Sequence, residues 1–171
     1  MAAILPLYMD GLYLSRYSDN KEAPTLSDYF ETPEEAVRHY GYLKQVYQSI
    51  SAKEVYSPYV FPWDCVVLTR SDVVLKMAYI AWMTNDIRLR EELCTYLPAL
   101  ESYNRASYIG IVLARTESKV EQEYVLQSLG DRSADIRDEA YKVLSEMSLS
   151  PEQYQHIEEP VSYTHLRAHE T

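Results

Sequence analysis

The sequence predicts an all-α fold, and three observations lead to that prediction. The stretch 129–147 (LGDRSADIRDEAYKVLSEM) places apolar residues on one face of a helix with a 3.6-residue period, and most of its charged residues face away. Several other segments begin with residues that cap helices. Only 4 of the 171 residues are glycine, which disfavours folds that need many tight turns. The apolar positions of this stretch are Ile136, Ala140, Val143, Leu144 and Met147.

Residues 1–60 form the first predicted part, an N-terminal helical segment. Apolar residues recur with helical spacing over 4–17, and a polar loop follows. The next helix begins at Pro33, because Thr32 can cap it, proline suits the first helical position and Glu35 stands where a capping box places an acid.

From Ser71 onward the chain becomes regular, and the pattern predicts one helix after another. The segment 72–84 is apolar on nearly all sides, as expected of a helix that lies between neighbours. Capping boxes at 118–121 and 150–153 mark the starts of two later helices. The helices that we expect in this part cover 72–84, 86–97, 102–115 and 118–129. A further helix follows the polar turn within 129–147, and another begins after Ser150.

An internal repeat relates these helices. A shift of 47 residues superposes Ser71 on Ser118, and it superposes LREEL (89–93) on IRDEA (136–140). We therefore divide the region 61–159 into units near 71–117 and 118–159. A period of about 40 to 47 residues is typical of helical solenoids.

The second unit resembles a HEAT repeat of the armadillo-type family: Leu, Asp, a polar turn, then apolar-Arg-x-x-Ala-x-x-x-Leu. The resemblance implies a right-handed α-solenoid in which a turn aspartate and a helix arginine form a structural ladder between repeats. Asp131 and Arg137 would be those residues. In the earlier unit Arg90 matches the arginine, but Thr84 replaces the aspartate. More weakly, FPWDC, LTRSD and LGDRS are similar to segments of large bacterial proteins of the molybdate-regulator-like group.

The end of the chain does not continue this pattern. Residues 161–171 (VSYTHLRAHET) back-translate to the transposase adapter of sequencing libraries, and the preceding bases of that adapter permit the proline at position 160. We therefore interpret 160–171 as a non-native tail, expect natural sequence to stop at Glu159, and expect the chain to be a fragment of a longer protein.

Composition and charge exclude several classes of protein. The formal net charge of −10 repels a nucleic-acid backbone, so we expect no nucleic-acid partner. No apolar run approaches the roughly 20 residues that span a bilayer, and the N-terminus lacks the basic start of a signal peptide. The two cysteines form no short motif, which suits a reducing compartment. We expect a cytoplasmic protein that does not bind membranes.

The residue types that carry chemistry are scattered along the sequence. Cys65, Cys94, His39 and His156 have no metal-ligand spacing, and Cys94 lies in an acidic segment that disfavours a thiolate nucleophile. The paired glutamates are adjacent in sequence, so the two members of a pair do not share a helix face. We predict no catalytic residue, no metal site and no cofactor.

The function that we predict is a non-catalytic scaffold that binds a protein or peptide inside a larger protein. Tyrosine is abundant (17 residues), and its ring dominates many interfaces, so Tyr96, Tyr103 and Tyr141 are the predicted contacts. The alternative is a regulatory or substrate-positioning part of an enzyme whose catalytic region is missing. An arginine stripe for an anionic partner is a second interpretation of residues that we otherwise assign to the ladder and to surface pairs: Arg88, Arg90, Arg105, Arg115, Arg132 and Arg137.

Overall fold

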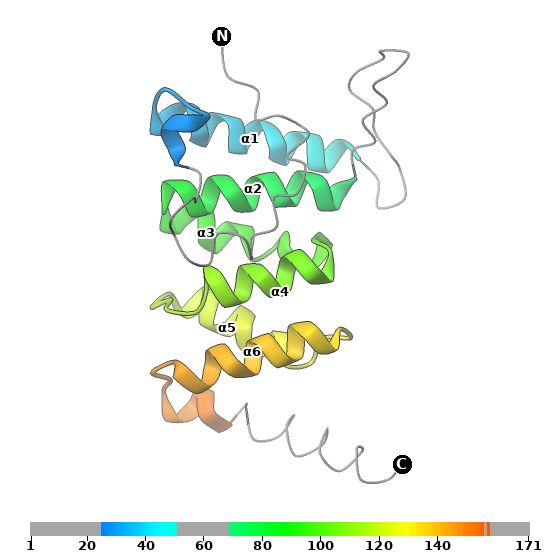
Figure 1. Cartoon of the computed structure of the whole chain (residues 1–171), viewed down its shortest axis with the longest axis vertical. Helices are drawn as coiled ribbons and strands as arrows, with labels where there is room; N and C mark the ends of the chain where they lie inside the picture. The colour runs from blue at the N-terminus through cyan, green and yellow to red at the C-terminus, as the bar shows by residue number, and fades with distance from the viewer. Residues whose placement is uncertain (1–24, 51–68, 156, 158–171) are drawn as a thin grey trace. The chain divides into compact units, whose positions relative to one another are not determined.

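The structure is a computed structural model that describes residues 25–50, 69–155 and 157. Every regular element in these ranges is helical, which confirms the predicted all-α class (Figure 1). The predicted helix at 4–17, residues 51–68 with the boundary near 60, and the tail 160–171 lie outside the described residues. The elements are η2 (Leu26–Asp28), α1 (Pro33–Ser49), α2 (Arg70–Thr84), α3 (Ile87–Leu93), η3 (Leu97–Ala99), α4 (Ser102–Ile111), α5 (Lys119–Ser128) and α6 (Ala134–Glu146), followed by a helical turn at 151–155.

The chain divides into two compact units, which we call unit 1 (residues 1–101) and unit 2 (residues 102–171). The division falls inside the first predicted repeat unit, 71–117. No helix within the described ranges has both the length and the apolarity that a membrane span requires.

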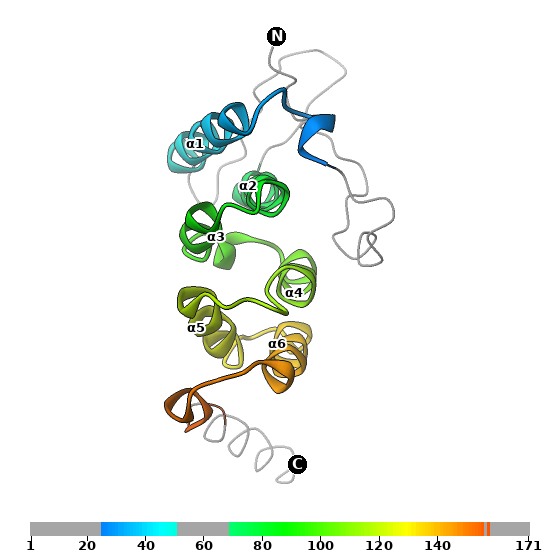
Figure 2. The ribbon, with the colours of Figure 1, turned by 90° about the vertical axis from the view of Figure 1, so that its left-hand side faces the viewer.

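In unit 1, α2 packs against both α1 and α3. Its side chains are buried on nearly every face, as the all-round apolar sequence of 72–84 predicts. Lys76 is the one charged residue among the buried side chains of this helix. Figure 2 shows α1 and α3 on one side of this unit and α2 on the other. The buried residues of α2 are Val73, Val74, Lys76, Met77, Ala78, Tyr79, Ile80 and Ala81.

Side chains also link α1 directly to α3. The buried Tyr40 hydroxyl donates to the carbonyl oxygen of Leu89 at 3.3 Å. One turn further along both helices, Lys44 Nζ lies 2.5 Å from the carboxylate of Glu92. Because the partner number rises as the α1 number rises, α1 and α3 run in the same direction.

In unit 2, α6 packs against α4 and α5. Arg105 of α4 pairs with Asp131 just before α6, and Gly110 further along α4 lies against the side chain of Glu139. These two contacts show that α4 and α6 also run in the same direction. Figures 1 and 2 agree that α4 and α6 lie side by side, with α5 in the other layer of the unit.

Local capping explains why most helices begin where they do. Thr32 accepts a hydrogen bond from the Glu35 amide at 3.2 Å, so the predicted start of α1 is confirmed. The Glu35 carboxylate accepts from the amide of Glu31, one residue before the predicted partner. Thr69 and Asp72 form a reciprocal capping box at the start of α2, which the sequence analysis did not identify.

Two predicted helix ends and one predicted capping box differ from the structure. The helix predicted over 86–97 ends at Leu93 and continues as turns into η3, because Pro98 cannot donate to a regular helix and disfavours helical geometry before it. The helix predicted over 102–115 ends at Ile111. At 118–121 the box is only half formed, because the Glu121 carboxylate accepts from Thr116 instead of closing back on Ser118.

The 47-residue shift matches some elements more closely than others. The starts of α3 and α6 differ by 47 residues (134 − 87), whereas those of α2 and α5 differ by 49 (119 − 70). Each predicted unit contains three α-helical segments: α2, α3 and α4 in the first, and α5, α6 and the turn at 151–155 in the second.

Candidate functional site

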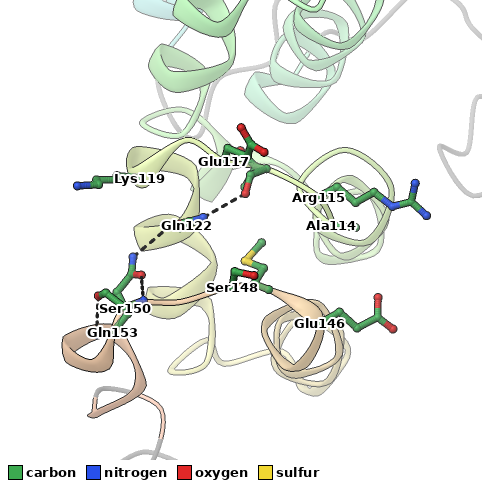
Figure 3. A pocket seen from close by; sticks show the side chains of 11 residues that line it. Ala114, Arg115, Glu117, Lys119, Gln122, Glu146, Ser148, Ser150 and Gln153 are labelled. Atoms are coloured by element: carbon green, nitrogen blue, oxygen red, sulfur yellow. Dashed lines mark hydrogen bonds between the residues drawn. The ribbon is translucent and has the colours of Figure 1, made fainter.

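Unit 2 contains a pocket of about 540 Å³, shown in Figure 3. The loop after α4, the start of α5, the end of α6 and the helical turn at 151–155 surround it. We call it the amide pocket, because two glutamine side chains form part of its wall. The residues used in the argument are Arg115, Glu117, Lys119, Gln122, Glu146 and Gln153.

A buried polar network holds the loop before α5 in place. The Thr116 hydroxyl donates to the Glu121 carboxylate at 2.7 Å and accepts from the Ser118 amide at 3.1 Å. Gln122 Nε2 donates to the Thr116 carbonyl oxygen at 3.1 Å. Thr116, Glu121 and Gln122 are all buried, so the bonds within this network offset the cost of removing their polar groups from water.

A second set of bonds joins α5 to the start of the last helical turn. Gln153 Nε2 donates to Gln122 Oε1 at 3.3 Å across the pocket wall (Figure 3). Gln153 also forms the predicted capping box with Ser150, whose amide donates to Gln153 Oε1 at 2.9 Å while the Ser150 hydroxyl accepts from the Gln153 amide at 3.3 Å. The two amide side chains therefore have positions fixed by their neighbours.

The amide groups of these two lining residues retain hydrogen-bonding capacity. Each glutamine side chain has two N–H donors and an oxygen with two lone pairs. The bonds described above use one donor of Gln122 and one donor of Gln153, and one lone pair of each oxygen. A ligand with both donors and acceptors, such as a peptide backbone, matches what remains.

Charges of both signs surround the pocket opening. Arg115, Glu117, Lys119 and Glu146 are all exposed. In Figure 3, Lys119 lies on the α5 side, whereas Arg115 and Glu146 lie at the opposite side. This mixed rim favours a ligand that carries charges of both signs over a polyanion.

The two predicted ladder arginines each bond to the turn that precedes their own helix. The Arg137 guanidinium donates to the carbonyl oxygens of Asp131 at 2.7 Å and Arg132 at 2.9 Å. Arg90 donates to the side-chain oxygen of Asn85 at 2.9 Å, and Asn85 caps α2 in the left-handed conformation. In both cases the arginine holds the turn together. A ladder between repeats stays a prediction.

The carboxylate of Asp131 has other partners than Arg137. It lies 3.1 Å from the guanidinium of Arg105 and accepts from the Ser133 amide at 2.8 Å. The side chains of Arg105 and Asp131 are only 13% and 21% exposed, so this ion pair joins α4 to the turn before α6 in a partly buried setting. Arg105 could not be identified from the sequence as the partner of Asp131, because the two residues are distant along the chain.

The three predicted tyrosine contacts differ in exposure. Tyr103 on α4 is 53% exposed and Tyr141 on α6 is 52% exposed. Tyr96 is half-buried, and its ring packs edge-on against Tyr47 of α1 with 4.9 Å between centroids. Given the parallel contacts of α4 and α6, Tyr103 and Tyr141 lie near opposite ends of this helix pair. None of the three lines the amide pocket.

The other candidate residues are separate from the pocket. His39 lies in α1, and the Cys94 thiol donates to the Arg90 carbonyl oxygen at 3.6 Å. Cys65 and His156 lie outside the described residues. Within the ranges that the structure describes, no group of three or more His, Cys, Asp and Glu side chains is arranged to hold a metal ion.

Fold and site together define an all-helical protein with a polar, amide-lined pocket. The chain belongs to a family of unknown function (DUF5724), whose model matches residues 1–168. The match extends into the tail 160–171, whose adapter origin stays a prediction. Comparisons with curated proteins and with solved structures found no match.

Proposed function

We propose that this chain is a non-catalytic helical-repeat module that binds a protein segment, within a larger cytoplasmic protein. The observation that carries the proposal is the amide pocket, where Gln122 and Gln153 are fixed by buried and capping hydrogen bonds and keep further amide capacity. An extended peptide presents N–H and C=O groups in alternation, which such amides can bind, while the charged rim selects among side chains.

The arrangement within each unit supports a solenoid as the scaffold. Helices two apart in the chain, α1 with α3 and α4 with α6, lie side by side and run in the same direction, while the helix between them lies in a second layer. Stacked helical repeats have this pattern, because each element buries a face against the next copy. We propose a right-handed, HEAT-like α-solenoid on this basis.

Selection of peptides from a random library displayed on phage tests the proposal. Enriched peptides should bind the purified protein, and Gln153→Ala should weaken them about fivefold, as expected for the loss of one neutral hydrogen bond of about 1 kcal/mol. Fluorescence anisotropy of a labelled peptide measures the dissociation constants.

Gln127→Ala is the matched control, because Gln127 is an exposed glutamine of α5 outside the pocket. Its affinity should equal that of the unmodified protein. If peptides bind the Gln153→Ala variant as tightly as they bind the control, the amide pocket is not the site where they bind. A clear gel shift with duplex DNA at low salt would oppose a protein partner altogether.

A further inference from the structure

One side of the amide pocket carries a group of hydrogen-bond donors, Lys119, Gln122 and Gln153, which we call the donor cluster. Lys119 and Gln122 are three residues apart on α5, so their side chains lie on one face of that helix. Gln153 is joined to Gln122 by the 3.3 Å bond between their amides. Figure 3 shows all three on the same side of the pocket, whereas Arg115 and Glu146 lie on the opposite side.

Each member of the donor cluster keeps at least one donor that the described part of the chain does not use. Gln122 Nε2 gives one of its two hydrogens to the Thr116 carbonyl oxygen, and Gln153 Nε2 gives one to Gln122 Oε1. The ammonium of Lys119 is exposed and makes no hydrogen bond or ion pair with any described residue. Lys119 extends away from the pocket in Figure 3, and rotation of its side-chain bonds can turn the ammonium over the pocket without breaking a contact.

The charges around the pocket opening limit what the donor cluster can bind. Lys119 gives the cluster a positive charge, while Arg115 and Glu146 on the opposite side carry opposite charges. Glu117 lies between the two sides at the opening (Figure 3). The two glutamates oppose a ligand with many negative charges, so the cluster fits a single anionic group.

We propose that the donor cluster binds the free C-terminal carboxylate of a peptide, an inference that rests on the proposed function. An ionised carboxylate only accepts hydrogen bonds and has about four lone-pair sites, which match the ammonium and the two amide N–H groups. Hydrogen bonds to an ionised group are shorter than neutral ones and about twice as strong. A carboxamide would instead turn its own N–H donors toward those of the cluster.

The size of the pocket and the remaining acceptors favour a chain end over an acidic side chain. A sphere of 540 Å³ is about 10 Å across, a length that about three residues of extended chain span. A chain end needs only one exit from such a pocket, whereas an internal segment needs two. The oxygens of Gln122 and Gln153 each keep a lone pair for the backbone N–H groups that precede the carboxylate. An acidic side chain would add the cost of fixing its own rotamers.

The donor cluster does not belong to the pattern that the two sequence copies share. Under the 47-residue shift, the corresponding positions of the first copy are Asp72, Leu75 and Ala106. None of these three side chains has an N–H group. The helix packing common to both copies therefore does not require donors at these positions.

Binding of matched peptide pairs to the full chain tests the proposal. Random hexapeptides carry fluorescein at the N-terminus, and each sequence is made twice, once with a free C-terminal carboxylate and once with a C-terminal amide. Fluorescence anisotropy gives the dissociation constant of both members of each pair. We expect the free acid to bind at least about tenfold more tightly than the amide, because the amide lacks the charge-assisted hydrogen bonds.

Two variants locate the effect within the pocket. Lys119→Met should reduce the ratio of the two dissociation constants to about threefold and leave the binding of the amides unchanged. Arg132→Met is the matched control, because Arg132 is an exposed cation of unit 2 outside the pocket, and it should leave the ratio unchanged. High salt should lower the ratio in the unmodified protein, since an exposed ammonium is screened.

The possible failures are distinguishable. If the paired acids and amides bind equally well, the carboxylate assignment is wrong, while peptide binding itself stands. If amidated peptides that contain Asp or Glu bind as tightly as the free acids, an acidic side chain is the ligand and the C-terminal assignment is wrong. If no peptide binds in either form, the proposed function and this inference are both wrong.

Discussion

Replacing Lys76 by methionine should stabilise the protein at neutral pH. Methionine keeps the length of the side chain and its apolar contacts but removes the buried ammonium. The pKa of Lys76 falls from 10.5 to about 8 on folding, a difference of about 2.5 units. At 1.36 kcal/mol per unit, the charged form therefore disfavours folding by up to about 3 kcal/mol.

The sign of the pH dependence follows from proton counts. Between pH 8 and 10.5 the unfolded chain holds the Lys76 proton while the folded chain has lost it, so the free energy of unfolding rises with pH across this window. Below pH 8 both states are protonated and the full penalty is present. The advantage of Lys76→Met should thus be largest at pH 7 and disappear by about pH 10.5.

Urea unfolding followed by far-UV circular dichroism, for both proteins at each pH, measures this difference. Groups that titrate alike in the two proteins cancel when the free energies are subtracted. Removal of the nearby positive charge should also raise the pKa of His39, which NMR titration can detect. Two free-energy curves that stay parallel from pH 7 to pH 10 would refute the argument from burial.

Two further substitutions test contacts that position the helices. Asp131→Ala should lower the free energy of unfolding by about 2 kcal/mol, because it removes the carboxylate that pairs with the largely buried guanidinium of Arg105. Lys142→Ala on the exposed side of α6 should cost only about 0.3 kcal/mol. Equal urea midpoints for the two variants would contradict this. Tyr40→Phe should cost about 1 kcal/mol through the lost bond to the α3 backbone, seen as a lower urea midpoint with an unchanged slope.

Helix starts were predictable from sequence where capping involves only near neighbours. Thr32 and Ser150 each bond to a residue three positions later, so the local pattern contains the whole interaction. Helix ends were less predictable. The α-helix that begins at Ile87 ends at Leu93, four residues earlier than its amphipathic pattern indicates, since the later residues form turns and η3.

The amide pocket and the burial of Lys76 could not be predicted, because both depend on residues that are distant in the sequence. Gln122 and Gln153 are 31 residues apart, and the sequence around neither residue indicates that their side chains form a hydrogen bond. The half-formed box at Ser118 is instructive: Glu121 has the residue type that capping needs, yet its carboxylate binds Thr116 inside the protein. Lys76 is the one charged residue of α2 after Asp72, and that isolated charge was the available signal.

The 47-residue sequence repeat and the amide pocket depend on different residues. Under the 47-residue shift, Glu121 and Gln122 correspond to Val74 and Leu75, so the first copy has apolar residues where the second has the buried polar pair. The apolar rhythm common to the two copies therefore accounts for the helix packing, and it does not account for the pocket. A buried carboxylate and amide add no stability that valine and leucine would lack, so helix packing alone does not account for Glu121 and Gln122. Their bonds to Thr116 instead fix the loop that lines the amide pocket.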